Sequence, residues 1–232
     1  MIFLSCESST LLGSVAVFKD HQLLAQKESL RQGSHSDVIN IFVQDVLQMA
    51  NLKLSDVDLF VSGVGPGSFT GIRISLNTIK TFAYCFNKKV LGINSLENLA
   101  LQCVREDQPI VAMINAFKNM VYIATYRHIA GKLVIIKPPE VVRVQNLSTY
   151  ITEKSIIVGD GFNVYSKYFS PELLLLIERE PQPLDEPKAS AVAALVLEKV
   201  QQSIHWSELL PLYLRSSEAE ENSQGIKFQP LI

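Results

Sequence analysis

The residues best placed to do chemistry form a glycine-rich turn, 65–68, between an apolar run and a helical pattern. The apolar run, 57–64, has the length of a buried strand, and residues 70–86 repeat apolar side chains at helical spacing. A strand, a glycine turn and the start of a helix together direct free backbone N–H groups and a partial positive charge at an anion. The pattern therefore predicts that Gly65, Gly67 and Ser68 hold a phosphate or nucleotide, or else that they form a tight turn without a ligand.

Two common nucleotide-binding motifs are excluded at this turn. The P-loop requires Lys and then Ser or Thr after its last glycine, whereas Gly71 is followed by Ile72 and Arg73. The three-glycine spacing of dinucleotide-binding folds, with its later acidic residue, is also missing. A phosphate at this turn would therefore have to be bound by a different fold.

A second polar turn follows the first apolar strand, 2–6, and a hairpin is predicted after it over 14–30. This order of strand, turn and hairpin is similar to the opening of sugar kinases, actin and chaperone ATPases, in which the first turn faces the nucleotide phosphates. We therefore expect Glu7, Ser8 and Ser9 to contribute to the same candidate phosphate site as the glycine turn.

The predicted helix 36–50 carries apolar side chains over an arc of roughly 240°, taking 100° per residue. A helix that packs on one sheet needs an apolar stripe of only about 100°. The excess predicts burial on two sides, against the helix's own sheet and against another protein, unless other parts of this chain cover the second side. Together with the helix after the glycine turn, it would form an association surface of Val38, Ile41, Phe42, Asp45, Met49, Arg73, Ile74, Asn77, Ile79 and Thr81.

Composition limits the class of protein. The chain has 232 residues, 47% hydrophobic content and a net charge of −2, which disfavours disorder and any general basic surface for nucleic acid. The three cysteines are far apart inside apolar patterns, which predicts buried free thiols in a reducing compartment. No signal peptide and no apolar run of membrane-spanning length is visible, so the expectation is a cytoplasmic protein without membrane contact.

The chain divides into two predicted lobes. The polar, proline-ended segment 105–109 marks a boundary between residues 1–105 and 106–215. The second lobe repeats the opening order of the first, with a strand, a polar turn and two further strands. Residues 216–232 are polar and partly acidic, and they are predicted to be a flexible tail.

The sequence GPGSFTGIR at 65–73 resembles the signature of the TsaB (YeaZ) proteins, which help to make threonylcarbamoyladenosine in bacterial tRNA. Further similar segments lie at 2–14, 33–36, 92–96 and 211–215. The resemblance implies an α/β fold of the ASKHA class (actin-like ATPase or RNase H-like), with two lobes that each hold a mixed sheet flanked by helices. It also implies two partners, a TsaD-like catalytic subunit bound through helices of the N-terminal lobe and a TsaE-like ATPase.

Departures from the family bear on mechanism. The catalytic relatives carry a metal-binding His-x-x-x-His motif where this chain has Ser95 and Leu99, which supply no imidazole nitrogen. No other group of ligand residues has suitable spacing, so neither a metal site nor a catalytic residue is expected. The resemblance then implies a non-catalytic scaffold or activator subunit. It would bind no cofactor firmly, would meet ATP, ADP and tRNA only through the complex, and would pair with itself when alone.

Two positions also differ from many TsaB-like chains. Glu7 stands in place of an aspartate in the first turn, and the hairpin 115–120 reads NAFKNM in place of DARRGE. Any contact that the family makes through this hairpin is therefore altered here.

Two other functions stay open. An independent small-molecule kinase or ATPase of the same fold would need acidic residues near Mg²⁺ and phosphate, and Glu7 and Asp160 are candidates, although both could be ordinary turn residues. A peptidase is the third interpretation, since relatives of this fold have been labelled glycoproteases, but no serine or cysteine has an evident catalytic base.

Overall fold

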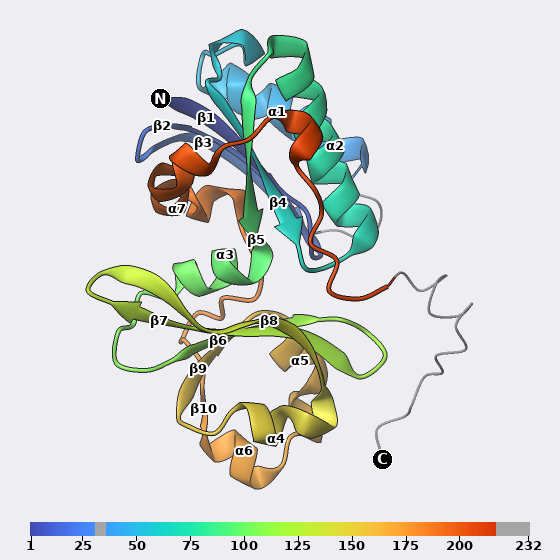
Figure 1. Cartoon of the computed structure of the whole chain (residues 1–232), viewed down its shortest axis with the longest axis vertical. Coiled ribbons are helices and arrows are strands. Elements are labelled where there is room, and N and C mark those ends of the chain that lie inside the picture. The colour runs from blue at the N-terminus through green and yellow to red at the C-terminus, as the bar shows by residue number, and fades with distance from the viewer. Residues whose placement is uncertain (31–35, 217–232) are drawn as a thin grey trace. The chain divides into compact units, whose positions relative to one another are not determined.

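The computed structural model describes residues 1–30 and 36–216 (Figure 1). The predicted tail beyond Ser216, and most of the similar segment at 33–36, lie outside the described residues. The chain forms two compact units, of which the first contains Met1–Asn98 with Pro187–Leu212 and the second contains Leu99–Glu186 and continues from Tyr213.

The first unit is built on a five-stranded mixed sheet in the order β3-β2-β1-β4-β5. Its strands are β1 (Ile2–Glu7), β2 (Leu12–Lys19), β3 (Gln22–Leu30), β4 (Leu59–Gly65) and β5 (Lys89–Asn94). The strands β1, β2 and β3 pair antiparallel, whereas β1, β4 and β5 pair parallel. The carboxyl ends of β1, β4 and β5 therefore meet at one edge of the sheet. The two turns predicted to hold phosphate follow β1 and β4, and Ser95 follows β5.

Two helices cover one face of this sheet, α1 (Ser36–Met49) and α2 (Phe69–Phe86) (Figure 1). The apolar stripe of each helix enters the core, because Ile39 and Val43 of α1 and Ile72 of α2 are at most 2% exposed. The helix α3 (Ser95–Gln102) follows β5 and carries the chain into the second unit.

The segment 187–212, which includes α7 (Ala193–Lys199), returns to the first unit and packs against β1, β2 and β5. Val90 and Ile204 exchange backbone hydrogen bonds of 3.0 and 2.9 Å, and the Leu212 N–H donates to the Val64 carbonyl at 2.8 Å. The boundary at residue 105 and a second lobe running on to 215 therefore differ from the structure, because these contacts attach the returning segment to the first sheet.

The second unit repeats the topology of the first. Its sheet has the order β10-β9-β6-β7-β8, in which β6, β9 and β10 pair parallel and β6, β7 and β8 antiparallel. The strands are β6 (Ile110–Asn115), β7 (Met120–Ile129), β8 (Lys132–Arg143), β9 (Ser155–Val158) and β10 (Ile177–Glu178). Two mixed sheets of equivalent strand order, flanked by helices, confirm the predicted ASKHA fold class.

One face of the second sheet is covered by three short helices, α4 (Leu147–Tyr150), α5 (Gly161–Tyr165) and α6 (Pro171–Leu175) (Figure 1). Leu147 and Tyr165 pack there against Met113 and Ile123 of the sheet. The hairpin between β6 and β7 is held by these strands and by α5, whose Tyr165 hydroxyl donates to the Asn115 side-chain oxygen.

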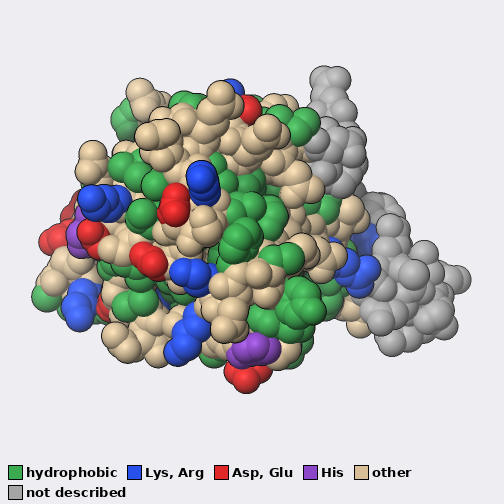
Figure 2. Space-filling model, turned by 90° about the horizontal axis from the view of Figure 1, so that it is seen from above, with side chains coloured by type: hydrophobic (Ala, Val, Ile, Leu, Met, Phe, Trp, Pro, Cys, Tyr) green, Lys and Arg blue, Asp and Glu red, His purple; other side chains and the backbone are tan. Residues whose placement is uncertain are grey.

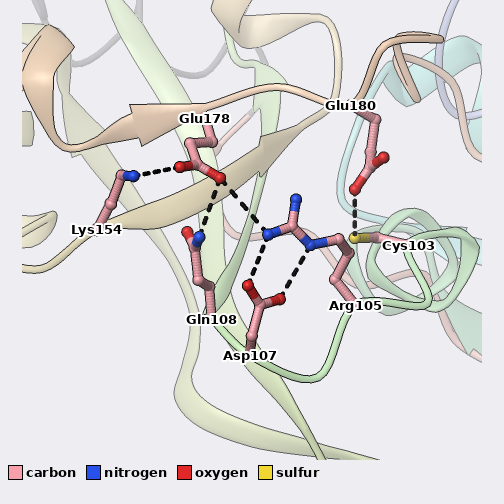
Figure 3. A network of polar contacts seen from close by, with 7 residues as sticks. All are labelled: Cys103, Arg105, Asp107, Gln108, Lys154, Glu178 and Glu180. Atoms are coloured by element: carbon pink, nitrogen blue, oxygen red, sulfur yellow. Dashed lines mark hydrogen bonds and ion pairs between the residues drawn. The ribbon is translucent and has the colours of Figure 1, made fainter.

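A polar network fastens the segment after α3 to β10 within the second unit (Figure 3). One set of contacts joins Arg105, Asp107, Gln108, Lys154 and Glu178, and beside it the Cys103 thiol donates to the Glu180 carboxylate at 3.7 Å. The Arg105 guanidinium donates to both carboxylate oxygens of Asp107, at 2.9 and 2.6 Å, and this holds the pKa of Asp107 at about 2. Glu178 pairs with Lys154 and accepts from Gln108 Nε2 at 2.9 Å. Since its charges pair with one another, the network acts as a structural clamp.

The cysteines follow the prediction in part. Cys6 and Cys103 are buried free thiols, but Cys85 on α2 is exposed, because it lies on the side of that helix away from the sheet. Among the described parts of the chain, no helix has both the length and the hydropathy needed to cross a membrane.

Candidate functional site

The two turns predicted to bind phosphate are neighbours in the first unit. They follow β1 and β4, which are adjacent parallel strands. The Ser68 N–H donates to the Ser9 carbonyl at 2.7 Å, and the Ser8 hydroxyl donates to the Gly71 carbonyl at 2.8 Å. The sequence pattern therefore identified two segments that the sheet does bring together.

The glycines of the second turn allow the first turn to approach closely. A Cβ atom on Gly71 would lie 1.9 Å from the Ser8 carbonyl oxygen, and one on Gly67 would lie 2.2 Å from that of Ser9. Gly65 has a φ of 97°, in the region that favours glycine. Packing of one turn on the other accounts for Gly67 and Gly71, and the backbone angle accounts for Gly65, without a bound anion.

The start of α2 uses some of its own donors. Ser68 is the N-cap, and its hydroxyl accepts from the Gly71 N–H at 3.3 Å. Its carbonyl accepts from the Ile72 N–H at 2.9 Å, while its own N–H is bonded to Ser9. Binding of nucleotide at this turn stays a prediction.

Glu7 is a buried carboxyl group at the carboxyl edge of the first sheet, only 1% exposed. Its Oε1 accepts from the Ser9 N–H at 2.8 Å, and its Oε2 accepts from the Ser95 hydroxyl at 3.1 Å. Burial raises the pKa of Glu7, and the hydrogen bonds from Ser9 and Ser95 partly oppose that effect. A Cβ on Gly63 would lie 2.2 Å from Oε2, so β4 leaves no room beside the carboxylate.

The Glu7–Ser95 contact gives Ser95 a specific role. By the resemblance, Ser95 stands where the catalytic relatives have the first histidine of their metal motif. Here its side chain is fully buried and donates to a carboxylate 88 residues earlier in the chain. Residue spacing alone gave no sign of this contact, because it depends on the packing of β5 next to β4.

Half of the ten residues of the predicted association surface are exposed. Ile41 and Met49 of α1 are 54% and 61% exposed, although both are large and apolar. Arg73, Asn77 and Thr81 of α2 are also exposed. The partly buried members are Val38, Phe42, Asp45 and Ile74. Hydrophobic side chains gather in the middle of one face of the molecule, with charged side chains mostly to one side (Figure 2).

The assignment of one residue, Ile79, to the predicted association surface is wrong. Ile79 is 0% exposed and packs in the core with Phe60 and Val90, so it cannot reach a partner of the folded protein. A helical wheel shows which side chains share a face, but it does not show which of two apolar faces meets the sheet.

A hollow lies between α1 and α2, with a volume of about 890 Å³. Its apolar lining includes Val43, Leu47, Leu52, Leu54 and Phe82. Amides and hydroxyls surround this lining, from Asn40, Gln44, Gln48, Asn77, Thr78 and Thr81. The sequence prediction included Asn77 and Thr81 but missed the amides of α1, because polar residues on a helix look like an ordinary solvated face.

The acidic residues considered for metal-dependent chemistry are engaged within the protein. Asp160, after β9, accepts from the Asn115 N–H at 2.8 Å, and burial raises its pKa to about 6. Over the residues that the structure describes, no three His, Cys, Asp or Glu side chains are grouped so that they could hold a metal ion.

Comparison with known proteins adds independent information. Residues 29–223 match the family model described as "TsaD: tRNA N6-adenosine threonylcarbamoyltransferase". A Bacillus subtilis protein named tRNA threonylcarbamoyladenosine biosynthesis protein TsaB is 25% identical over 223 residues, which are 95% of this chain and 96% of that protein. The Escherichia coli protein of the same name is 27% identical and covers 97% of this chain and 99% of its own length.

Solved structures agree on the fold. The structure titled "YeaZ from Pseudomonas aeruginosa" has a TM-score of 0.75 and 24% identity, and it covers 92% of this chain and 99% of its own. A second Pseudomonas aeruginosa structure, described as similar to peptidase YEAZ, has a TM-score of 0.77 and 23% identity, with the same coverage.

Proposed function

The chain belongs to the TsaB (YeaZ) family of tRNA threonylcarbamoyladenosine biosynthesis proteins, and from that premise we propose that it pairs with a TsaD-like catalytic subunit as a scaffold or activator. The observation that carries the proposal is the surface of α1 and α2, where Ile41 and Met49 remain exposed and where the two helices border an apolar hollow with an uncharged rim. Such a surface is suited to bind another helical surface.

The energetics favour a protein occupant. Exposed apolar side chains such as Ile41 and Met49 each gain about 1.5–3 kcal/mol on full burial, and less here because each is already partly covered. The amides and hydroxyls of the rim can form hydrogen bonds across an interface without the desolvation cost of charges. In the absence of its partner, the same surface would pair two copies of this chain.

Ser95 and Leu99 support a non-catalytic role. They occupy the positions at which the catalytic relatives have metal-binding histidines, and a hydroxyl and a methyl-bearing chain are poor replacements for imidazole. The Ser95 hydroxyl is also committed to Glu7. In this proposal, the transfer chemistry occurs on the TsaD-like subunit, and nucleotide and a TsaE-like ATPase act in the assembled complex.

The test is pairing with the TsaD-like protein of the same organism, measured by size-exclusion chromatography with light scattering. Ile41→Glu places a charge on the exposed side of α1 and should weaken the complex at least about tenfold, because a carboxylate is costly to bury without a partner. The matched control is Leu175→Glu, since Leu175 is an exposed leucine of α6 in the second unit, 80% exposed. It should pair like the wild type.

The pairing assay separates an error in the surface from an error in the subunit role. Normal pairing by a folded Ile41→Glu variant would show that the surface is wrong. Failure of the wild-type chain to bind the TsaD-like protein at all would contradict the subunit role itself.

A further inference from the structure

The turn between β6 and β7 has an unusual backbone. Three successive residues that are not glycine, Phe117, Lys118 and Asn119, have φ values of 56°, 49° and 60°. This left-handed region is unfavourable for residues with a Cβ, and Asn tolerates it better than Phe or Lys. A run of three such residues persists only where surrounding contacts impose it.

The first set of contacts comes from the end of β6 and from α5. The Asn115 side-chain oxygen accepts from the Phe117 N–H at 2.8 Å and from the Tyr165 hydroxyl at 3.0 Å. The Asn115 N–H in turn donates to Asp160 at 2.8 Å. The base of the turn is therefore tied to the segment that follows β9.

The second set holds the top of the turn. The Arg215 guanidinium donates to the carbonyls of Ala116 and Phe117, the latter at 3.4 Å. The Phe117 carbonyl also accepts from the Met120 N–H at 3.0 Å, and the Asn119 carbonyl from the Val144 N–H at 3.0 Å. These contacts fix the backbone while the Phe117 side chain stays 67% exposed. The hairpin thus presents an aromatic ring to solvent on a rigid support.

Cationic residues lie next to Phe117 in the turn and in the adjoining strand. Lys118 follows it in the turn, Arg215 contacts its backbone, and Arg143 is paired with Met120 at the start of β7. The Asp160 carboxylate at the base of the hairpin is partly buried and accepts from the Asn115 N–H. An exposed ring beside cations is the combination with which proteins stack unpaired bases and hold the neighbouring phosphates.

We propose that the hairpin 116–119 binds a single-stranded segment of RNA, with an unpaired base stacked on Phe117 and the adjoining phosphates near Lys118 and Arg143. The proposal rests on the proposed function, which makes tRNA the substrate of the complex, and it adds a direct RNA contact by this chain. A protein partner is less well matched, because a protein anchor residue is normally surrounded by further apolar contacts, whereas Ala116 is buried and Lys118 and Asn119 are polar.

The test measures binding of a fluorescently labelled, unmodified tRNA transcript to the complex of this chain with the TsaD-like protein. Phe117→Ala should weaken RNA binding at least about fivefold, because stacking on an aromatic ring typically contributes that much or more. Phe117→Trp should restore it. Lys118→Ala should lower the dependence of affinity on salt by about one phosphate contact.

Tyr168→Ala is the matched control. Tyr168 is an exposed aromatic residue of the same unit, 47% exposed, with the ammonium of Lys167 4.9 Å from its ring centre. Its replacement should leave RNA binding unchanged. If Phe117→Ala binds RNA like the wild type, or if it weakens pairing with the TsaD-like protein and not RNA binding, the proposal is overturned.

The same series with a labelled single-stranded oligonucleotide and the chain alone separates this proposal from the proposed function. A loss of oligonucleotide binding on Phe117→Ala would support the RNA site even if pairing with the TsaD-like protein fails. Equal affinity of the wild type and Phe117→Ala for the oligonucleotide would contradict the RNA site.

Discussion

Replacement of Asp160 by asparagine should stabilise this protein near neutral pH. Burial of the Asp160 carboxyl disfavours its charged form and raises its pKa from 3.8 to about 6, while the hydrogen bond from the Asn115 N–H opposes that effect and the negative charge of Asp185 adds to it. Asparagine is close in shape and keeps an oxygen that can accept from the Asn115 N–H. The variant therefore removes a buried charge and can retain the contact that supports the hairpin.

The sign of the pH dependence follows from the two pKa values. Below pH 3.8, both the folded and the unfolded protein carry the neutral acid, and Asp160 causes no loss of stability. As the pH rises to about 6, the unfolded chain ionises while the folded chain holds its proton, so the free energy of unfolding falls. Above that pH the loss is complete, and at 1.36 kcal/mol per pKa unit it amounts to at most about 3 kcal/mol.

The assay is urea unfolding of the wild type and Asp160→Asn at several pH values between 3.5 and 7.5. The free energy of unfolding of the variant minus that of the wild type should increase across this range by up to about 3 kcal/mol. Taking this difference cancels the pH dependence of all groups that the two proteins share. Asp107→Asn is a control in which the same difference should decrease as the pH rises. Arg105 lowers the pKa of Asp107 to about 2, so the Asp107 carboxylate stabilises the folded state once the pH exceeds the pKa of the unfolded chain. A difference for Asp160→Asn that is flat with pH, or that decreases, would refute the reasoning.

Three further predictions test the packing. Ile79→Glu should unfold the protein, as judged by circular dichroism, since it buries a charge in the core; a soluble, folded variant would show that the assignment of Ile79 to the core is wrong. Gly71→Ala should lower the free energy of unfolding by more than about 2 kcal/mol, because its Cβ would lie 1.9 Å from the Ser8 carbonyl oxygen, and an unchanged denaturation midpoint would contradict the turn-to-turn contact. Asn115→Ala should leave the fold intact but increase amide exchange at Phe117, whose N–H loses its acceptor, and equal protection in both proteins would exclude this support of the hairpin.

The sequence alone determined the elements whose signals are local. The length of the apolar run before Gly65 and the helical spacing after it predicted β4 and α2, because strand and helix periods are set by a few consecutive residues. The match GPGSFTGIR indicated the family, since a long run of specific residues is rarely shared by chance. The exposed apolar side of α1 was also visible from spacing, although Ile79 of α2 was wrongly included in the association surface.

Only the tertiary structure decided the features that join distant segments. Nothing in Phe117 and Lys118 predicts left-handed backbone, because their own preference is against it; Arg215, Asp160 and Asn115 impose it from three parts of the chain. The Ser95–Glu7 hydrogen bond likewise exists because parallel strands bring their carboxyl ends together. Sequence periodicity reports which residues can share a surface, whereas the packing of elements far apart in the chain determines which surface is buried and which contacts form.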